Sequence, residues 1–142
     1  MIVYSYEKLS YGMYSYAIPY LNGATVPEML YVSEGYLFLR PDIHFNVGTP
    51  HSDMHECIDA AIERVIELGY VDEERIGYEG FSFGGHCGMY MSTQENRFAA
   101  IAAGAGVSNL VQGFNIDIVR DGSNEQDYYM TGQGRLGADP TA

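Results

Sequence analysis

One amphipathic segment dominates the hydrophobic pattern of this chain. From Asp53 onward, apolar residues recur every three or four positions, and Glu and Arg residues occupy the positions between them. Asp53 and Glu56 form a capping-box pair that predicts the start of a helix, and Gly69 predicts its end. The predicted buried face comprises Met54, Cys57, Ile58, Ala61, Ile62, Val65 and Leu68.

Short runs of apolar, β-branched and aromatic residues predict strands at residues 2–6, 36–39, 75–81 and 98–103. The run at 36–39 is continuously apolar, which is typical of a strand covered on both faces. The run at 98–103 is a further candidate for a buried strand. Strands separated by helices are typical of a parallel sheet with right-handed crossovers.

Two further helices fill the gaps between these strands. The segment 25–35 begins with the capping-box pair Thr25 and Glu28 and ends at Gly35, and residues 84–93 form a helix of small residues. Residues 44–50 are predicted to be a loop. Beyond Gly104 the pattern fades: a short helix could carry Leu110, Val111 and Phe114, and residues 121–142 are rich in Gly, Asp and Asn.

Composition and charge narrow the classes of function. A chain of 142 residues is the size of one domain, and its 46% hydrophobic content excludes a disordered or collagen-like protein. Nineteen acidic and seven basic residues give a net charge of -12, which argues against nucleic acid and anionic membrane surfaces as partners. No apolar run approaches the ~20 residues that cross a bilayer. No signal peptide is visible, and two cysteines are too few for a disulfide framework, so the compartment stays open.

The strongest chemical signal is the sequence G-x-S-x-G at residues 80–84, centred on Ser82. It lies between a predicted strand and a predicted helix, where the nucleophile elbow of hydrolases requires it. Side chains at Gly80 and Gly84 would collide with the neighbouring strand and helix. The helix N-terminus favours negative charge beside Ser82, and the Phe83 N–H becomes a candidate oxyanion donor. The alternative is a serine in a glycine-rich turn of a phosphate-binding or flavodoxin-like sheet.

Together with this motif, four other segments resemble the catalytic domain of the prolyl oligopeptidase family of serine peptidases. They are residues 3–7, 33–42, 69–77 and 97–100. The resemblance implies an α/β-hydrolase core, a mostly parallel sheet with helices on both faces. It also implies a peptide substrate and no metal or organic cofactor.

The same resemblance implies a role for each site residue. Ser82 would be the nucleophile that forms an acyl-enzyme, and the Phe83 N–H one oxyanion donor. Tyr6 falls on the family's tyrosine whose hydroxyl is the second donor. Val107, Leu110 and the Phe83 side chain would line the apolar pocket for the residue before the scissile bond, commonly proline.

The chain departs from the family's pattern in its acid and base. The triad order of this fold is Ser, then Asp or Glu, then His, yet all four histidines lie at or before the helix that follows Ser82. We therefore expect residues 1–142 to be a partial α/β-hydrolase domain, truncated at both ends, without the downstream Asp and His. Such a chain would be inactive or nearly so, and its exposed sheet edge would promote self-association. A carboxylesterase of the same fold and a non-catalytic interaction domain are the alternatives.

Four weaker patterns favour structural interpretations. His51 and His55 have metal-ligand spacing, but H-E-x-x-H is broken after His55, and His51 precedes the predicted helix start. Residues 104–109 begin like a dinucleotide loop but lack its third glycine, so a packing turn is favoured. Cys57 and Cys87 are expected to be buried small hydrophobic residues. The acidic run 72–74 is expected to be a solvated turn.

Overall fold

The computed structural model describes residues 1–6, 27–94, 97–115 and 125–140. Its four strands all run parallel in one sheet, in the order β2-β1-β3-β4. They are β1 (Ile2–Tyr4), β2 (Phe38–Leu39), β3 (Gly77–Phe81) and β4 (Ala100–Gly104). The parallel sheet predicted from the alternation of strands and helices is confirmed, although each strand is shorter than its apolar run.

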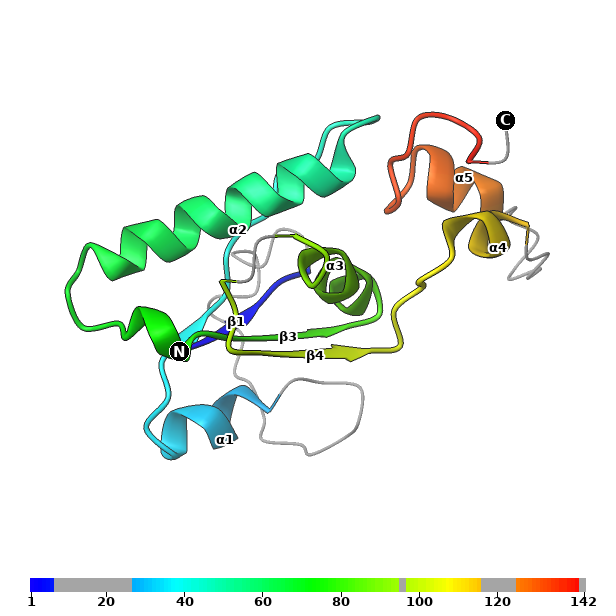
Figure 1. The fold of residues 1–142 in the computed structure, drawn as a ribbon. Helices are drawn as coiled ribbons and strands as arrows, with labels where there is room; N and C mark the ends of the chain where they lie inside the picture. Colours follow the sequence, from blue (N-terminus) through cyan, green and yellow to red (C-terminus); the bar gives the residue numbers. More distant parts are fainter. Residues whose placement is uncertain (7–26, 95–96, 116–124, 141–142) are drawn as a thin grey trace.

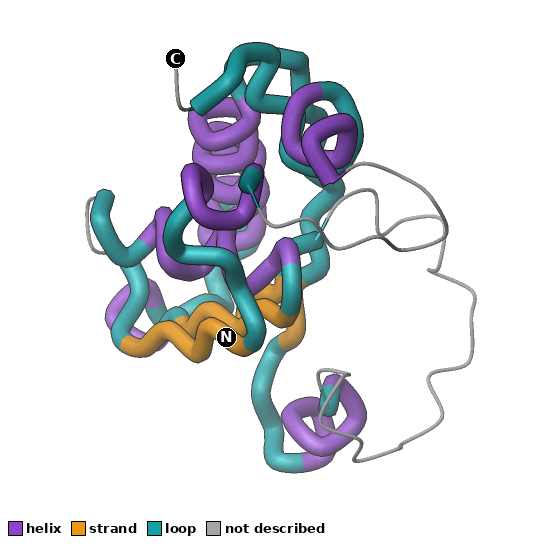
Figure 2. Tube along the Cα trace, turned by 90° about the vertical axis from the view of Figure 1, so that its right-hand side faces the viewer, coloured by secondary structure: helices purple, strands orange, loops and turns teal. Residues whose placement is uncertain are grey.

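Helices lie on both faces of this sheet (Figure 1). Figure 2 shows the same layering after a quarter turn, with one short helix on one side of the strands and the longer helices on the other. The lone helix is α1 (Glu28–Ser33), and the opposite face carries α2 (Pro50–Ile66) and α3 (Phe83–Met91). The remaining helices are α4 (Leu110–Phe114), α5 (Glu125–Met130) and the 3-10 turn η2 (Glu73–Arg75).

The hydrophobic core lies between the sheet and the helices α2 and α3. Alternate residues of a strand point to opposite faces, so Val3 of β1 and Tyr78 of β3, which are register partners, both point into this core. Met54, Ile58 and Ile62 of the predicted face supply the facing layer, whereas the prediction is wrong for Leu68, which lies beyond the end of α2 and is 49% exposed. The buried core residues are Val3, Ile43, Met54, Ile58, Ile62, Ile76, Tyr78, Phe83, Cys87, Met91 and Phe98.

The predicted start of the long helix is wrong by three residues, because α2 begins at Pro50 rather than at Asp53. Proline is favoured in the first helical turn, where its missing N–H is not needed. The Asp53 carboxylate instead binds the preceding loop: it accepts hydrogen bonds from Asn46 N at 2.6 Å, Asn46 Nδ2 at 3.0 Å and Thr49 Oγ1 at 3.0 Å. These bonds, the Asn46 backbone N–H foremost, lower the pKa of Asp53. His51 therefore lies inside α2.

Other expectations fare unevenly. Gly35 and Gly69 follow α1 and α2 with φ of 86° and 81°, as helix-ending glycines do. Thr25 lies outside the described residues, so its capping role is untested.

The strand predicted as buried at 98–103 is an exposed edge strand, β4, with Ala100, Ala102 and Ala103 accessible. Helix α5 was not predicted. None of the described helices is long and apolar enough to span a bilayer.

Candidate active site

Ser82 occupies a sharp turn between β3 and α3. Its backbone lies at φ 56° and ψ -116°, in the left-handed half of conformational space that non-glycine residues rarely adopt. A residue held in this way costs about 1–3 kcal/mol. The Ser82 N–H donates to the Gly104 carbonyl at the end of β4 (2.9 Å), and the Ser82 carbonyl accepts the first helical hydrogen bond of α3 from the His86 N–H (3.0 Å). Both bonds hold the strained residue in place.

Glycines make this turn possible at the two positions that flank Ser82. A Cβ atom on Gly80 would overlap the backbone carbonyl of Gly84, and a Cβ atom on Gly84 would overlap the carbonyl oxygen of Ser5 on the neighbouring strand. These are the collisions expected from the sequence. Any larger side chain would therefore push α3 away from the sheet.

The N-terminus of α3 points its free donors at the surroundings of Ser82. Phe83 is the first residue of this nine-residue helix, and the first N–H groups of a helix have no partner within it. The helix dipole adds a partial positive charge at the same end. Negative charge that develops beside the Ser82 hydroxyl is therefore stabilised at this place.

Tyr6 reaches the same region from the end of β1. Its ring packs edge-on against the Phe83 ring, with centroids 6.2 Å apart and an interplanar angle of 82°. A Cβ atom on Gly84 would lie 3.9 Å from Tyr6 Cδ2. The structure thus brings Tyr6 to the first turn of α3, the region in which the resemblance implies it lies.

An apolar pocket of about 60 Å³ lies beside Ser82. Phe83, Val107 and Leu110, the three residues assigned to a pocket from the sequence, all line it together with Ser82. Sequence reasoning missed the other walls, which include Met54 of α2, Tyr129 of α5 and the segment after α5. Met54 was assigned to the buried face of its helix. Tyr129 carried no signal, because its segment is rich in polar residues.

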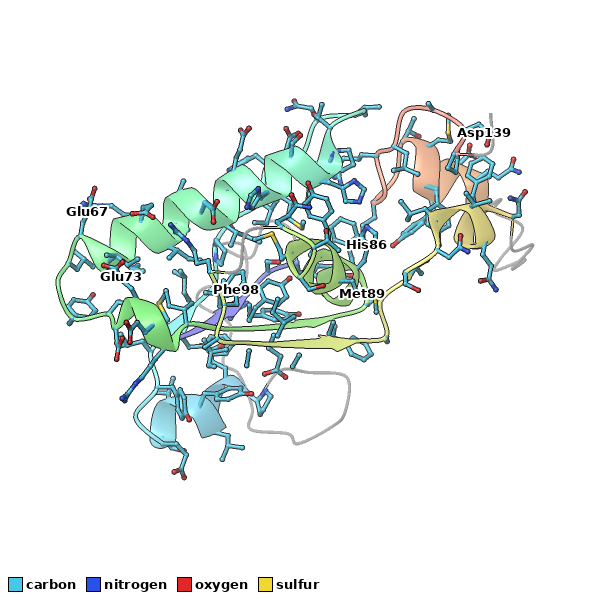
Figure 3. The ribbon with its side chains drawn as sticks, in the orientation of Figure 1. Glu67, Glu73, His86, Met89, Phe98 and Asp139 are labelled. Atoms are coloured by element: carbon cyan, nitrogen blue, oxygen red, sulfur yellow. The ribbon has the colours of Figure 1, made fainter. Side chains whose placement is uncertain are left out.

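Two histidines form a hydrogen-bonded pair at the edge of this pocket. His51 Nε2 lies 2.8 Å from His86 Nε2, and His86 Nδ1 lies 2.6 Å from the Val107 carbonyl oxygen. The carbonyl only accepts, so His86 Nδ1 carries a proton, and a single proton lies between the two Nε2 atoms. Burial, and secondarily the neighbouring His86, lower the pKa of His51. Figure 3 shows His86 on α3 beneath the first turns of α2.

No hydrogen bond joins a histidine to the Ser82 hydroxyl among the described residues. His51 and His86 bond each other, His55 contacts Asp59 at 3.2 Å, and His44 is exposed in the loop before α2. His51 and His55 thus turn to different partners. No three His, Cys, Asp or Glu side chains gather around a common point in the described part of the chain.

The remaining weak patterns of the sequence are a packing turn, two cysteines and an exposed acidic turn. The turn at 104–109 packs against α3, where a Cβ atom on Gly106 would overlap the backbone of Gly85 and His86. Cys87 is buried, whereas Cys57 is only partly buried. The acidic turn 72–74 is exposed, and Figure 3 places Glu67 and Glu73 near the C-terminal end of α2, away from His86.

Comparison with known proteins supplies one match. The model of the prolyl oligopeptidase family matches residues 46–133, more than half of the chain. This range includes the strained turn at Ser82, the two pocket residues Val107 and Leu110, and the paired histidines. No curated protein and no solved structure matches the chain.

Proposed function

Because the chain belongs to the prolyl oligopeptidase family, whose α/β-hydrolase fold agrees with its parallel sheet, we propose that Ser82 is the nucleophile of a serine peptidase. The observation that carries the proposal is the strained conformation of Ser82 between two glycines that tolerate no side chain. This turn exposes the hydroxyl to an apolar pocket and puts it beside the N-terminus of a helix.

The proposed reaction is acyl transfer from a peptide bond. The Ser82 oxygen attacks the carbonyl carbon and gives up its proton to a general base, so that the carbon becomes tetrahedral and the carbonyl oxygen carries a negative charge. That charge accepts hydrogen bonds from the Phe83 N–H and from the Tyr6 hydroxyl, which together form the oxyanion hole. Collapse of the intermediate breaks the C–N bond, and the amine leaves with the proton returned by that base. Water then hydrolyses the ester on Ser82 and regenerates the hydroxyl.

The pocket lining supports an apolar residue before the scissile bond. Phe83, Val107 and Leu110 offer carbon surface, and the paired histidines use their facing nitrogens on each other. A compact ring such as proline fits this chemistry, because its side chain seeks no hydrogen bond. Cleavage after proline is therefore our proposal for substrate preference.

The proposed acid and base lie outside the described residues. A serine hydroxyl is a weak nucleophile at neutral pH unless a base accepts its proton. His51, His86 and His55 bond other partners and His44 is exposed in the loop before α2, so this chain by itself is expected to be inactive or nearly so. Loss of a triad member leaves only the contribution of the oxyanion hole and substrate binding.

A fluorophosphonate labelling experiment tests the nucleophile and the missing base together. Intact-mass spectrometry follows labelling of the chain with and without imidazole in the buffer, and peptide mapping locates the adduct. We expect slow labelling at Ser82 that imidazole accelerates, and none in the Ser82→Ala variant. Fast labelling without imidazole contradicts the proposed inactivity. An adduct at another residue, or none with imidazole, contradicts the assignment of Ser82.

Ester and amide substrates separate the peptidase from the carboxylesterase alternative. With imidazole present, a nitroanilide of a proline-containing dipeptide and a nitrophenyl ester of a short acid are compared in the wild-type chain and in Ser82→Ala. A nitroanilide with glycine in place of proline is measured as well. A peptidase pocket is expected to give a faster acylation rate with the proline compound than with this glycine compound. No difference between proline and glycine contradicts the proposed preference.

A further inference from the structure

A buried chain of hydroxyl groups links β1, β3 and α3 beneath Ser82. The Ser5 Oγ lies 2.7 Å from the Tyr78 hydroxyl, and the Tyr78 hydroxyl donates to the Gly84 carbonyl at 2.8 Å. Ser5 is fully buried and Tyr78 is 2% exposed. Polar groups at this depth are costly unless they are hydrogen-bonded, so these bonds are specific features of the core.

The direction of the hydrogen bonds follows from their chemistry. A backbone carbonyl only accepts, so the single proton of the Tyr78 hydroxyl points at Gly84. Ser5 must then donate to the Tyr78 oxygen. Burial raises the pKa of Tyr78 well above its usual value, so the tyrosine keeps this proton over the working range of the protein.

Glycines on α3 make room for this contact. The ring of Tyr78 packs against Gly88, where a Cβ atom would lie only 2.7 Å from Tyr78 Cε1. One turn earlier, Gly84 lies against the Ser5 carbonyl, where a Cβ atom would overlap it. The first turns of α3 therefore sit directly on Ser5 and Tyr78, and the hydroxyl chain crosses this narrow gap.

The two ends of the chain adjoin the two proposed oxyanion donors. Ser5 immediately precedes Tyr6, and Gly84 immediately follows Phe83. We propose that Tyr78 is a positioning residue whose hydroxyl holds the first turn of α3 against the end of β1 through its hydrogen bonds to Ser5 and Gly84. These two bonds fix the separation between the Tyr6 hydroxyl and the Phe83 N–H. This inference rests on the proposed function, because it assigns Tyr78 to the geometry of that oxyanion hole.

A double-mutant cycle between Tyr78 and Tyr6 tests the proposal. The measured quantity is the rate constant for fluorophosphonate labelling of Ser82 in the full chain, with imidazole as the added base. Tyr6→Phe removes one donor and is expected to slow labelling by about 100-fold. Tyr78→Phe is expected to slow it by about tenfold, because small displacements of catalytic groups cost rate steeply. In the Tyr6→Phe background, Tyr78→Phe should change the rate by no more than about twofold.

Non-additivity is the signature that a merely structural role does not produce. If Tyr78 only stabilises the fold, Tyr78→Phe slows labelling by the same factor in both backgrounds, and the proposal is overturned while the proposed function stands. If Tyr6→Phe leaves the rate unchanged, the oxyanion role of Tyr6 fails and the positioning role fails with it. Absence of any labelling at Ser82 overturns both.

Two further variants are controls for changes in the labelling rate that do not come from the position of the oxyanion donors. Tyr4→Phe removes a hydroxyl from the same strand β1, on the sheet face opposite Val3, where the Tyr4 ring stacks on Phe38 of β2, and should leave the rate unchanged. Ser5→Ala/Tyr78→Phe removes both hydroxyls, so no buried hydroxyl loses its partner. This double variant should label as slowly as Tyr78→Phe alone while its thermal unfolding returns toward the wild-type midpoint. Recovery of the labelling rate along with the midpoint contradicts the positioning role.

Discussion

At the residue scale, Ser82 keeps a conformation that its own side chain disfavours. A backbone conformation in this sparsely populated region costs an ordinary residue about 1–3 kcal/mol. The cost is borne because hydrogen bonds on both sides of Ser82 and the close approach of α3 to Ser5 leave no relaxed alternative. Strain held in this way at a pocket wall is typical of a functional turn rather than of a connecting loop.

Alanine substitutions at two glycines separate two contributions to the loss of unfolding free energy, a steric clash and backbone strain. Gly84→Ala brings a methyl group onto the Ser5 carbonyl, whereas Gly69→Ala meets no atom within 4 Å but keeps a φ of 81°. Gly69→Ala should cost about 1 kcal/mol of unfolding free energy. Gly84→Ala should cost about 3 kcal/mol or more, because backbone on both sides of the clash cannot yield.

Urea denaturation followed by circular dichroism measures both variants. A folded Gly84→Ala protein with a loss no larger than that of Gly69→Ala would show that α3 can move away from β1. The need for glycine beside Ser82 would then have another cause.

The residues around Ser82 also show which features of the site can be predicted from the sequence. Gly80, Ser82 and Gly84 could be assigned from their spacing, because a tight turn imposes its demands on neighbours in the chain. The bond between Ser5 and Tyr78 joins residues 73 positions apart, and nothing local marks it. It depends on the register that pairs Val3 with Tyr78, which only the folded sheet defines.

At the element scale, the paired histidines join the first turn of α2 to α3. His51 lies on α2, its ring contacts Tyr90 of α3 with centroids 4.8 Å apart, and its Nε2 bonds His86. Helix α2 otherwise meets α3 through apolar side chains such as Met54 and Cys87. His51 is therefore a group of this helix contact whose pKa the fold lowers, chiefly by burial.

The lowered pKa of His51 predicts a loss of stability in mild acid. The pKa of His51 is lower in the folded chain than its ordinary value of about 6.5 in the unfolded chain. As the pH falls below about 6.5, the unfolded chain takes up a proton that the folded chain resists, so the unfolding free energy decreases until the folded pKa is passed. His51→Gln should flatten this decrease between about pH 7 and pH 5, above the range of most carboxylates.

Urea unfolding midpoints are measured at several pH values across this range. The quantity compared between variants is the slope of the midpoint against pH, not the absolute stability. His44→Gln is the matched control, since His44 is exposed in the loop before α2. A slope that changes as much in His44→Gln as in His51→Gln contradicts a special role for the pair.

Element boundaries illustrate a second limit of sequence patterns. The buried face of α2 was predictable, because the helical period decides which residues meet the core. Its start was not, since Asp53 serves the preceding loop with the same carboxylate that could have capped a helix. Helix α5 has no apolar stripe. Its packing depends on Tyr129 against Gly113 of α4, a tertiary contact.

At the scale of the whole molecule, the sheet gathers the site at one edge. Tyr6 follows β1, Ser82 follows β3 and Val107 lies shortly after β4, so all three lie beyond the carboxyl ends of parallel strands. Ligands of open α/β sheets bind at this edge. The alternation of strands and helices predicted that arrangement, because parallel strands end on the same side. It could not predict that β4 would be an exposed edge, since an apolar run is equally typical of a central strand.

The exposed edge leads to a prediction about association. Among the described strands, none pairs with the outer side of β4, whose sequence carries no charge. Unpaired strands without charged residues are templates for pairing with another chain. We propose that a second copy of this chain pairs there, and that the net charge of -12 opposes the contact. Association should therefore increase with protein concentration and with salt, which screens repulsion over about 8–10 Å.

Sedimentation velocity with a pair of matched variants tests this edge. Ala102→Lys places a charge on β4, whereas Ala60→Lys makes the same change on the exposed surface of α2. Both reduce the net negative charge equally, so a general electrostatic effect promotes association in both. Edge pairing instead predicts that Ala102→Lys stays monomeric under conditions in which Ala60→Lys associates. A wild-type chain that remains monomeric at high concentration and high salt contradicts the prediction, because the β4 edge would then be inert as a template.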